Sequence, residues 1–359
     1  MFGPARAVQQ KLLQAFVAFL IGGAGGAFFY AIGAPLPWTL GSLFAAAIVS
    51  IIGLPWRMPG PVRDVARPVV GILAGSAFTP AVIASIGQWW SAIVFVLIYS
   101  LVITGLGFLF FRRFCKLDPV TSFFASTPGG LSELSLIGSS LGGNMGQLVL
   151  IHSMRVVAVV FAVPLILQLV LGHAPGRTAL PLAADEAATL NDWLILAACG
   201  VGGYALAKRF DLPGGTMVSA MVLSAIVHGA ALTEIVPPGW LVALVQVVVG
   251  SVAGARFAGV RGREVRRTLL YAALWCGVLL ATATAAASLG SWLFHRPFSA
   301  LLLSLSPGGL PEMTIISYAL GIEVAFVVTC QVVRSFSVLA FGPSVFRLCG
   351  SPGVKRDRD

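Results

Sequence analysis

The sequence contains few charged side chains. Of its 359 residues, 10% are Asp, Glu, Lys or Arg, whereas about a quarter of an ordinary soluble domain is charged. The hydrophobic share is 58% and the mean hydropathy is +0.94. No polar segment is long enough to fold as a soluble reading module, so the chain is not expected to bind nucleic acid. Most of it must face lipid or the interior of a protein.

Patterns for metals and nucleotides are also missing. The five cysteines have no paired spacing and the four histidines do not cluster, so no copper, iron or zinc centre is indicated. No Walker A motif is present, which argues against ATP-driven transport by this chain. We therefore expect no cofactor, no metal and no enzymatic activity.

The sequence does contain apolar runs of bilayer length. About 20 apolar residues cross the hydrocarbon core as a helix, and ten such runs predict about ten transmembrane helices. The first run lacks a small-residue cleavage site, so we expect it to be a retained span. Two further runs, 119–141 and 298–320, are interrupted by Pro-Gly-Gly. The ten runs are 12–33, 38–54, 68–87, 89–111, 147–171, 192–207, 214–233, 240–258, 268–293 and 323–346.

An internal repeat relates the two interrupted runs. Ser-Thr-Pro-Gly-Gly-Leu-Ser-Glu-Leu at 126–134 is echoed by Leu-Ser-Pro-Gly-Gly-Leu-Pro-Glu-Met at 305–313, which lies 179 positions later. The same offset aligns Arg155 with Arg334 and Gly71 with Gly250 without a gap. The chain is therefore interpreted as two membrane repeats, residues 1–180 and 181–359, joined by the polar loop 173–192.

The repeated motif resembles a known family. Pro-Gly-Gly-Leu-Ser-Glu and Pro-Gly-Gly-Leu-Pro-Glu, each followed 22 residues later by Arg, are similar to the duplicated AbrB-type membrane proteins, and the match covers essentially the whole chain. That family is often labelled an ammonia monooxygenase or a regulator. The resemblance implies a duplicated helical membrane protein, and the residues themselves support neither label.

The distribution of basic residues predicts the topology. If both Pro-Gly-Gly segments are re-entrant hairpins and the amino terminus is inside, 19 Lys and Arg residues lie on the cytoplasmic side and two lie outside. If both segments span, the split is 14 to seven. The positive-inside rule therefore favours ten spans plus two hairpins, arranged as inverted repeats with both termini cytoplasmic. A bacterial inner membrane is the expected location.

The interrupted runs are the candidate site because a broken helix in lipid must be buried in protein or line a cavity. We expect each proline to end one short helix and a second helix to begin at Leu131 and at Leu310. The free amides of such a helix start attract anions. The candidate binding residues at the two breaks are Pro128, Gly129, Gly130, Pro307, Gly308 and Gly309.

Four charged residues lie at membrane depth. Glu133 and Glu312 fall at the third position of the second short helices, where a carboxylate can cap the helix start. Arg155 and Arg334 lie in the interior of long apolar runs. One interpretation is an ion pair within each half, Glu133 with Arg155 and Glu312 with Arg334. The other is a site for an anionic solute with a titrating glutamate, and both can hold together.

Six further positions complete the predicted site and its surroundings. His152 lies one turn before Arg155 and aligns with Gln331, so it is either a packing residue or a proton acceptor. Gly71 and Gly75, with their counterparts Gly250 and Gly254, permit close helix packing.

These observations predict a secondary transporter of a small anionic solute. The alternative is a membrane-embedded sensor that regulates gene expression through a partner, as the family label suggests. Coupling to H⁺ or Na⁺ and a homo-oligomeric state are both allowed. If the two hairpins enter from opposite faces, Gly130 and Gly309 should lie within bridging distance in one composite site.

Overall fold

A computed structural model describes residues 4–34, 36–54, 56, 58–171, 189–210, 215–257 and 263–348. These residues form helices and no strand. Six of the described helices are long and apolar enough to cross a membrane, so the chain is a multi-pass, all-α membrane protein. Residues 173–188 of the predicted join, 173–192, lie outside the described residues.

The elements follow the order in which the sequence repeats. The first half contains α1 (Pro4–Ala31), α2 (Pro37–Ile52), α3 (Gly60–Gly75), α4 (Pro80–Ser85), η1 (Ile86–Gln88), α5 (Trp90–Arg113), α6 (Pro119–Ser126), α7 (Leu131–Ser140) and α8 (Met145–Leu171). The second half contains α9 (Leu190–Phe210), α10 (Gly215–Gly229), α11 (Gly239–Ala255), α12 (Arg263–Phe294), α13 (Phe298–Leu305), α14 (Leu310–Ala319) and α15 (Val324–Leu348). Helices α3, α6, α7 and α8 each begin 179 positions before α11, α13, α14 and α15.

The predicted count of ten spans stays a prediction. The six long apolar helices are α1, α5, α8, α9, α12 and α15. The predicted span 68–87 is not one straight helix, because α3 and the α4–η1 segment meet at a bend of 70°. Helices α2, α10 and α11 have 16, 15 and 17 residues. At 1.5 Å per residue they are about 22–26 Å long, somewhat less than a hydrocarbon core of about 30 Å.

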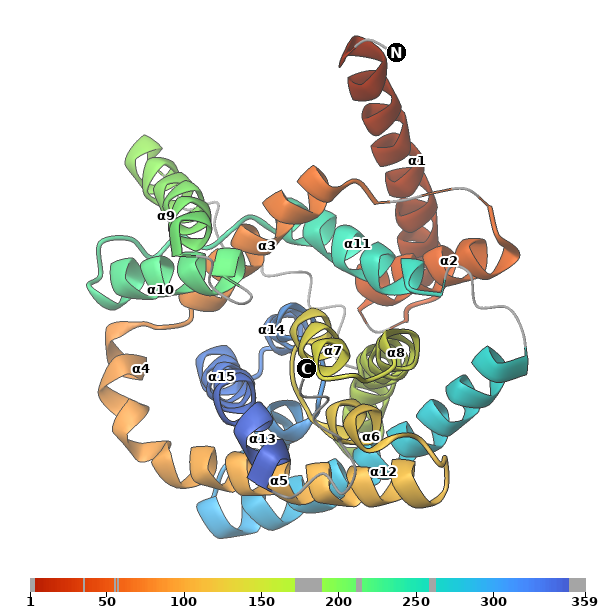
Figure 1. The fold of residues 1–359 in the computed structure, drawn as a ribbon. Coiled ribbons are helices and arrows are strands. Elements are labelled where there is room, and N and C mark those ends of the chain that lie inside the picture. Colours follow the sequence, from red (N-terminus) through yellow and green to blue (C-terminus); the bar gives the residue numbers. More distant parts are fainter. Residues whose placement is uncertain are drawn as a thin grey trace.

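The two halves are interleaved rather than placed side by side. Figure 1 shows α6–α8 and α13–α15 together in the middle, with α5 and α12 crossing along one edge. On the opposite edge, α2 of the first half packs along α11 of the second, and α10 of the second packs along α3 of the first. Because α2 corresponds to α10 and α3 to α11, the two contacts are copies of each other.

Glycines allow these interhelical contacts. A side chain on Gly71 or Gly75 of α3 would collide with the carbonyls of Met217 and Met221 on α10. Their repeat-related glycines on α11 meet the carbonyls of Thr39 and Leu43 on α2 in the same way. The predicted packing role of these glycines is confirmed, and the partners are α10 and α2 rather than the Pro-Gly-Gly breaks.

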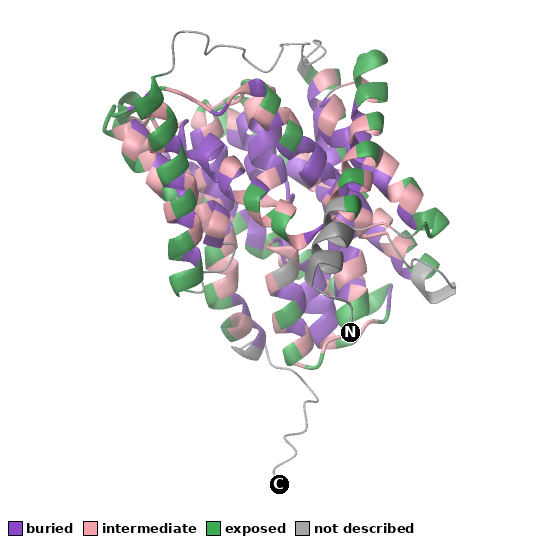
Figure 2. Cartoon of the chain, turned by 90° about the horizontal axis from the view of Figure 1, so that it is seen from above, coloured by how far each residue is buried: buried purple, intermediate pink, exposed green. Residues whose placement is uncertain are grey.

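Polarity is distributed as a lipid solvent requires. Figure 2 shows buried residues in the interior and exposed residues along the outer helices. Large apolar side chains are exposed on the outside, among them Leu101, Phe161 and Val201, while Arg155 and Arg334 are buried. A water-soluble surface would not carry so many exposed apolar residues. The protein therefore holds these two arginines in its interior, and its outer surface presents apolar side chains to the bilayer.

Candidate functional site

Each Pro-Gly-Gly segment is a break between two short helices. Helix α6 ends at Ser126 and α13 at Leu305, before Pro128 and Pro307, whose rings cannot continue a helix. Helices α7 and α14 then begin at Leu131 and Leu310, as predicted, with Gly130 and Gly309 as extended N-cap residues.

The arginines bind the carbonyl ends of the first short helices. Arg155 on α8 donates from Nη1 to the Thr127 carbonyl at 2.9 Å and from Nη2 to the Gly129 carbonyl at 2.8 Å. Arg334 on α15 donates to the carbonyls of Ser304, Leu305 and Ser306 at 3.0–3.3 Å. Each guanidinium therefore lies at the negative end of a helix, where the last carbonyls have no partner within the helix.

This geometry corrects the predicted ion pairs. Among the described residues, neither Arg155 nor Arg334 forms an ion pair with Glu133 or Glu312. The backbone carbonyls at each break are buried acceptors that need a donor, and the arginines supply it. The arginines thus serve as C-caps for α6 and α13.

The glutamates lie over the glycines that begin the second short helices. A side chain on Gly130 would collide with the Glu133 carboxylate, and one on Gly309 with that of Glu312. A carboxylate at this position is stabilised by the positive end of the helix. Glu133 is half-buried, whereas Glu312 is buried, and its Oε2 has no hydrogen-bond partner in the described structure. Gly130 and Gly309 therefore keep room for an acidic group at each break.

His152 and Gln331 occupy matching places beside the arginines. Gln331 donates from Nε2 to the Leu303 carbonyl at 2.7 Å and accepts from Arg334 through Oε1. His152 is fully buried and faces the carbonyl of Phe124, the counterpart of Leu303, yet neither ring nitrogen makes a hydrogen bond within the described residues. Gln331 therefore bonds to both the backbone and the arginine, whereas His152 has both ring nitrogens unpaired within the described residues.

Sequence reasoning missed Arg256. It is one of the 19 basic residues that the charge count places on the cytoplasmic side, but it is the C-cap residue of α11 and lies close enough to Glu312 to attract it and to Arg155 to repel it. Its Nη1 atom is buried without a hydrogen-bond partner in the part of the chain that the structure describes. The first repeat has Ala77 at the matching position. This difference between the repeats is the sequence signal that could have pointed to Arg256.

The two breaks belong to one polar region. Helix α7 contacts α15 and α14 contacts α8, so each second short helix touches the arginine-bearing helix of the other half. A side chain on Gly129 would lie 3.2 Å from Val338, one turn beyond Arg334. Arg334 also lies close enough to Arg155 for their charges to repel each other. The region contains three arginines and two glutamates, a formal excess of one positive charge.

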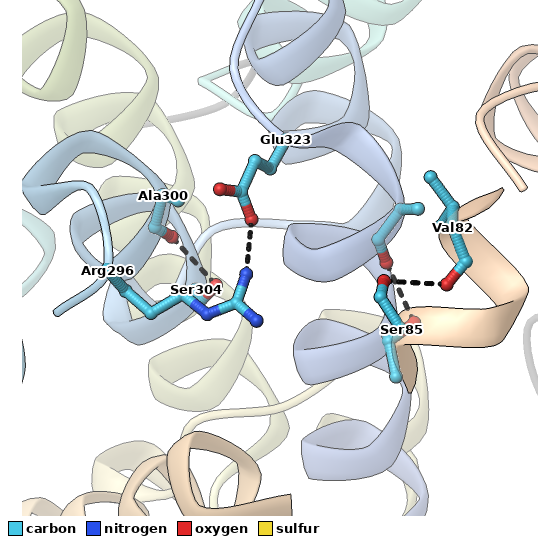
Figure 3. A network of polar contacts seen from close by, with 8 residues as sticks. Val82, Ser85, Arg296, Ala300, Ser304 and Glu323 are labelled. Atoms are coloured by element: carbon cyan, nitrogen blue, oxygen red, sulfur yellow. Dashed lines mark hydrogen bonds and ion pairs between the residues drawn. The ribbon is translucent and has the colours of Figure 1, made fainter. Parts of the chain in front are cut away.

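The second break also has an ion pair at its outer end. Arg296, just before α13, meets Glu323, just before α15, at 2.9 Å, and its guanidinium lies over the Phe326 ring at 5.1 Å. Figure 3 shows the Arg296 guanidinium directed at Glu323, beside the bond from Ser304 to Ala300 on α13. The repeat-related residue of Glu323 is Asn144, so only the second half can form this pair.

Comparisons with known proteins agree with the repeat motif. A family model described as transition state regulatory protein AbrB matches residues 38–350. A Bacillus subtilis (strain 168) protein described as uncharacterized, YhjN, is 27% identical, over 97% of each chain. An Escherichia coli (strain K12) protein, named as a proposed regulator AbrB, is 24% identical over 91% of this chain and 94% of its own length.

Proposed function

We propose, from the premise that this chain belongs to the AbrB family, that it is a secondary transporter with a solute site between its two broken helices. In this proposal, residues 1–180 and 181–359 are inverted repeats with ten spans and two re-entrant hairpins. Both termini lie in the cytoplasm of a bacterium, and the transport cycle includes no catalytic step. Broken helices that meet between inverted repeats are the recurrent site architecture of secondary transporters.

The observation that carries the proposal is the set of buried charges at the breaks. Keeping Arg155, Arg334 and Glu312 inside a membrane protein costs free energy, and such residues usually mark a solute or ion pathway. Capping explains part of what the arginines do. It does not explain why Glu312 Oε2 and Arg256 Nη1 are buried without a hydrogen-bond partner among the described residues. These two atoms are available to a transported solute, an ion or water.

The charge balance favours an anionic solute. The three arginines exceed the two glutamates by one formal positive charge, and Arg63 and Arg67 lie close enough to Arg256 to add to it. A bound monoanion would offset this positive charge, and Arg256, which lies close enough to Glu312 to attract its carboxylate, has a donor at Nη1 that is unpaired within the described structure. Glu312 then serves as the coupling group, because it is a buried acid at membrane depth whose Oε2 has no hydrogen-bond partner among the described residues. H⁺ is therefore the coupling ion we favour over Na⁺.

A flux measurement tests this function. Purified protein in liposomes should take up one member of a panel of radiolabelled small carboxylates when a pH gradient is imposed. Glu312→Gln should abolish the dependence on the gradient, whereas Glu234→Gln, which changes an exposed glutamate outside the site, should not.

The same experiment separates the transporter from the regulator that the family description suggests. A regulator acting through a partner should show no flux with any solute. It should also retain its effect on gene expression in cells after the Glu312→Gln change. That pair of results would overturn the transporter.

A further inference from the structure

A cavity lies outside the charged region, between α5, α6 and α15. Its volume is about 820 Å³, within the range of small-molecule sites. The lining surface is mostly apolar, and its polar side chains are Arg112 at the end of α5, Thr127 at the first break, Ser100, Thr104 and Ser337. Leu101 and Phe341, which line it from α5 and α15, are 64% and 65% exposed, so the cavity opens sideways between two spans.

Two glycines keep this cavity open. Gly105 on α5 and Gly342 on α15 both line it, and a side chain at either position would meet no atom within 4 Å. Glycine weakens a helix, so it is usually found inside one where another chain approaches closely. Gly107, two residues along α5, is a glycine of this kind, because Trp275 and Ser126 pack closely against it. Gly105 and Gly342 have no such neighbour, and what they provide is space.

The matching interface of the other half is filled. Gly105 corresponds to Thr284 and Gly342 to Val163, and Val163 is fully buried where α8 packs along α12. The repeat therefore does not give the other half the same pair of glycines.

We propose that this cavity binds one acyl chain of an anionic phospholipid, with the phosphate on Arg112. Along α5, the lining runs from Leu97 to Arg112, about 22 Å at 1.5 Å per residue. One leaflet contributes about 15 Å of hydrocarbon, so the cavity is long enough to hold the part of an acyl chain that enters it from the interface. Arg112 lies in the last turn of a spanning helix, where basic side chains meet lipid phosphates. Its Nη1 donates to the Leu117 carbonyl at 2.9 Å, and its other nitrogens can bind phosphate oxygens.

This assignment does not depend on transport, because the ligand is a resident lipid. A thermal unfolding series on the full-length protein in detergent tests it. Phosphatidylglycerol should raise the melting temperature more than phosphatidylcholine, and inorganic phosphate alone should not raise it. Arg112→Gln should remove the advantage of the anionic lipid. Arg113→Gln, which removes the adjacent exposed charge outside the cavity, should preserve it.

Filling the cavity tests the acyl chain separately. Gly105→Leu should remove stabilisation by both lipids, whereas Gly105→Ala should keep most of it. Equal responses in the Arg112 and Arg113 variants, or an unchanged response in Gly105→Leu, would overturn the proposal. So would a full response to inorganic phosphate alone.

Photolabelling of the unmodified protein tests the site without requiring that any variant folds. Phosphatidylglycerol carrying a diazirine on its acyl chain should label peptides from 97–108 and 337–346. Labelling confined to other helices would refute the site. A disulfide between two copies carrying Ser337→Cys would assign the cavity to a dimer interface instead.

Discussion

Arg155 and Arg334 use their hydrogen bonds on the carbonyl ends of short helices, which sets how a variant should behave. Arg155→Gln removes two charge-assisted bonds, to Thr127 and Gly129, and should cost roughly 3 kcal/mol of unfolding free energy. Adding Glu133→Gln should restore none of it, because the carboxylate is not the partner. The four members of this double-mutant cycle, unfolded in detergent, should show coupling below about 0.5 kcal/mol. Recovery in the double variant would re-establish the ion pair.

His152 gives a second residue-scale prediction, because the repeat supplies its matched control. Gln331 bonds the Leu303 carbonyl, so His152→Gln places the same amide opposite Phe124. We expect this variant to gain about 1 kcal/mol of stability by satisfying a buried acceptor. The reciprocal Gln331→His should lose stability. Thermal unfolding measures the stability, and the liposome assay measures the flux. A His152→Gln variant that is stable but does not transport would indicate that the imidazole ring carries a proton.

At the scale of elements, the glycine contacts between helices can be tested by alanine. Gly254→Ala drives a methyl group into the Leu43 carbonyl and the Ala46 side chain of α2, and should destabilise the protein by about 1–3 kcal/mol. Gly277→Ala on α12 meets no atom within 4 Å and should stabilise it by about 0.5–1 kcal/mol. Melting temperatures of the two variants should therefore move in opposite directions. A stabilised Gly254→Ala would contradict the close packing of α11 on α2.

The boundaries of the short helices could be predicted from sequence, but their partners could not. Proline and glycine act locally, so Pro128 and Gly130 limit α6 and α7 wherever the break lies in the fold. The acceptors for Arg155 are backbone carbonyls, which every residue has, and so no side-chain pattern identifies them. Glu133 is the partner that the sequence suggests instead, because a buried charge at membrane depth needs an opposite charge. The bend between α3 and α4 was hidden for a similar reason, since apolar composition continues across it.

At the scale of the whole molecule, the interleaving of the halves explains why Arg256 was missed. Its place in a basic cluster is typical of a loop that fixes topology. Only the packing of α11 along α2 and against α14 brings the end of α11 beside Glu312. Charge attraction between residues 56 positions apart on different elements leaves no local trace in one sequence. The absence of a matching arginine at Ala77 is the one sign that sequence comparison of the halves can offer.

The inverted arrangement of those halves is open to direct test by cysteine labelling. The sequence alone suggests probes at Ala184, Thr233 and Gly262, but Ala184 and Gly262 lie outside the described residues. Thr233 is buried and donates to Asp192 at 2.6 Å, so a thiol there would be shielded. Glu234 is exposed beside it, and Arg209 is exposed at the end of α9. These two positions replace the shielded ones.

The inverted and parallel models give opposite results at the new probes. In the inverted model, Glu234→Cys reacts with an impermeant maleimide from outside the cell and Arg209→Cys does not; in the parallel model, the two exchange sides. Lys116→Cys is cytoplasmic in both and serves as the control. The neighbouring native thiol, Cys115, adds little background, because burial raises its pKa to about 11 and keeps it protonated at neutral pH.

We expect labelling at Glu234 alone, since the opposite orientation would place Lys208, Arg209 and the 256–267 arginines outside, against the positive-inside rule. Labelling at Arg209 would make the halves parallel and remove the pseudo-two-fold axis on which the shared site between the breaks depends.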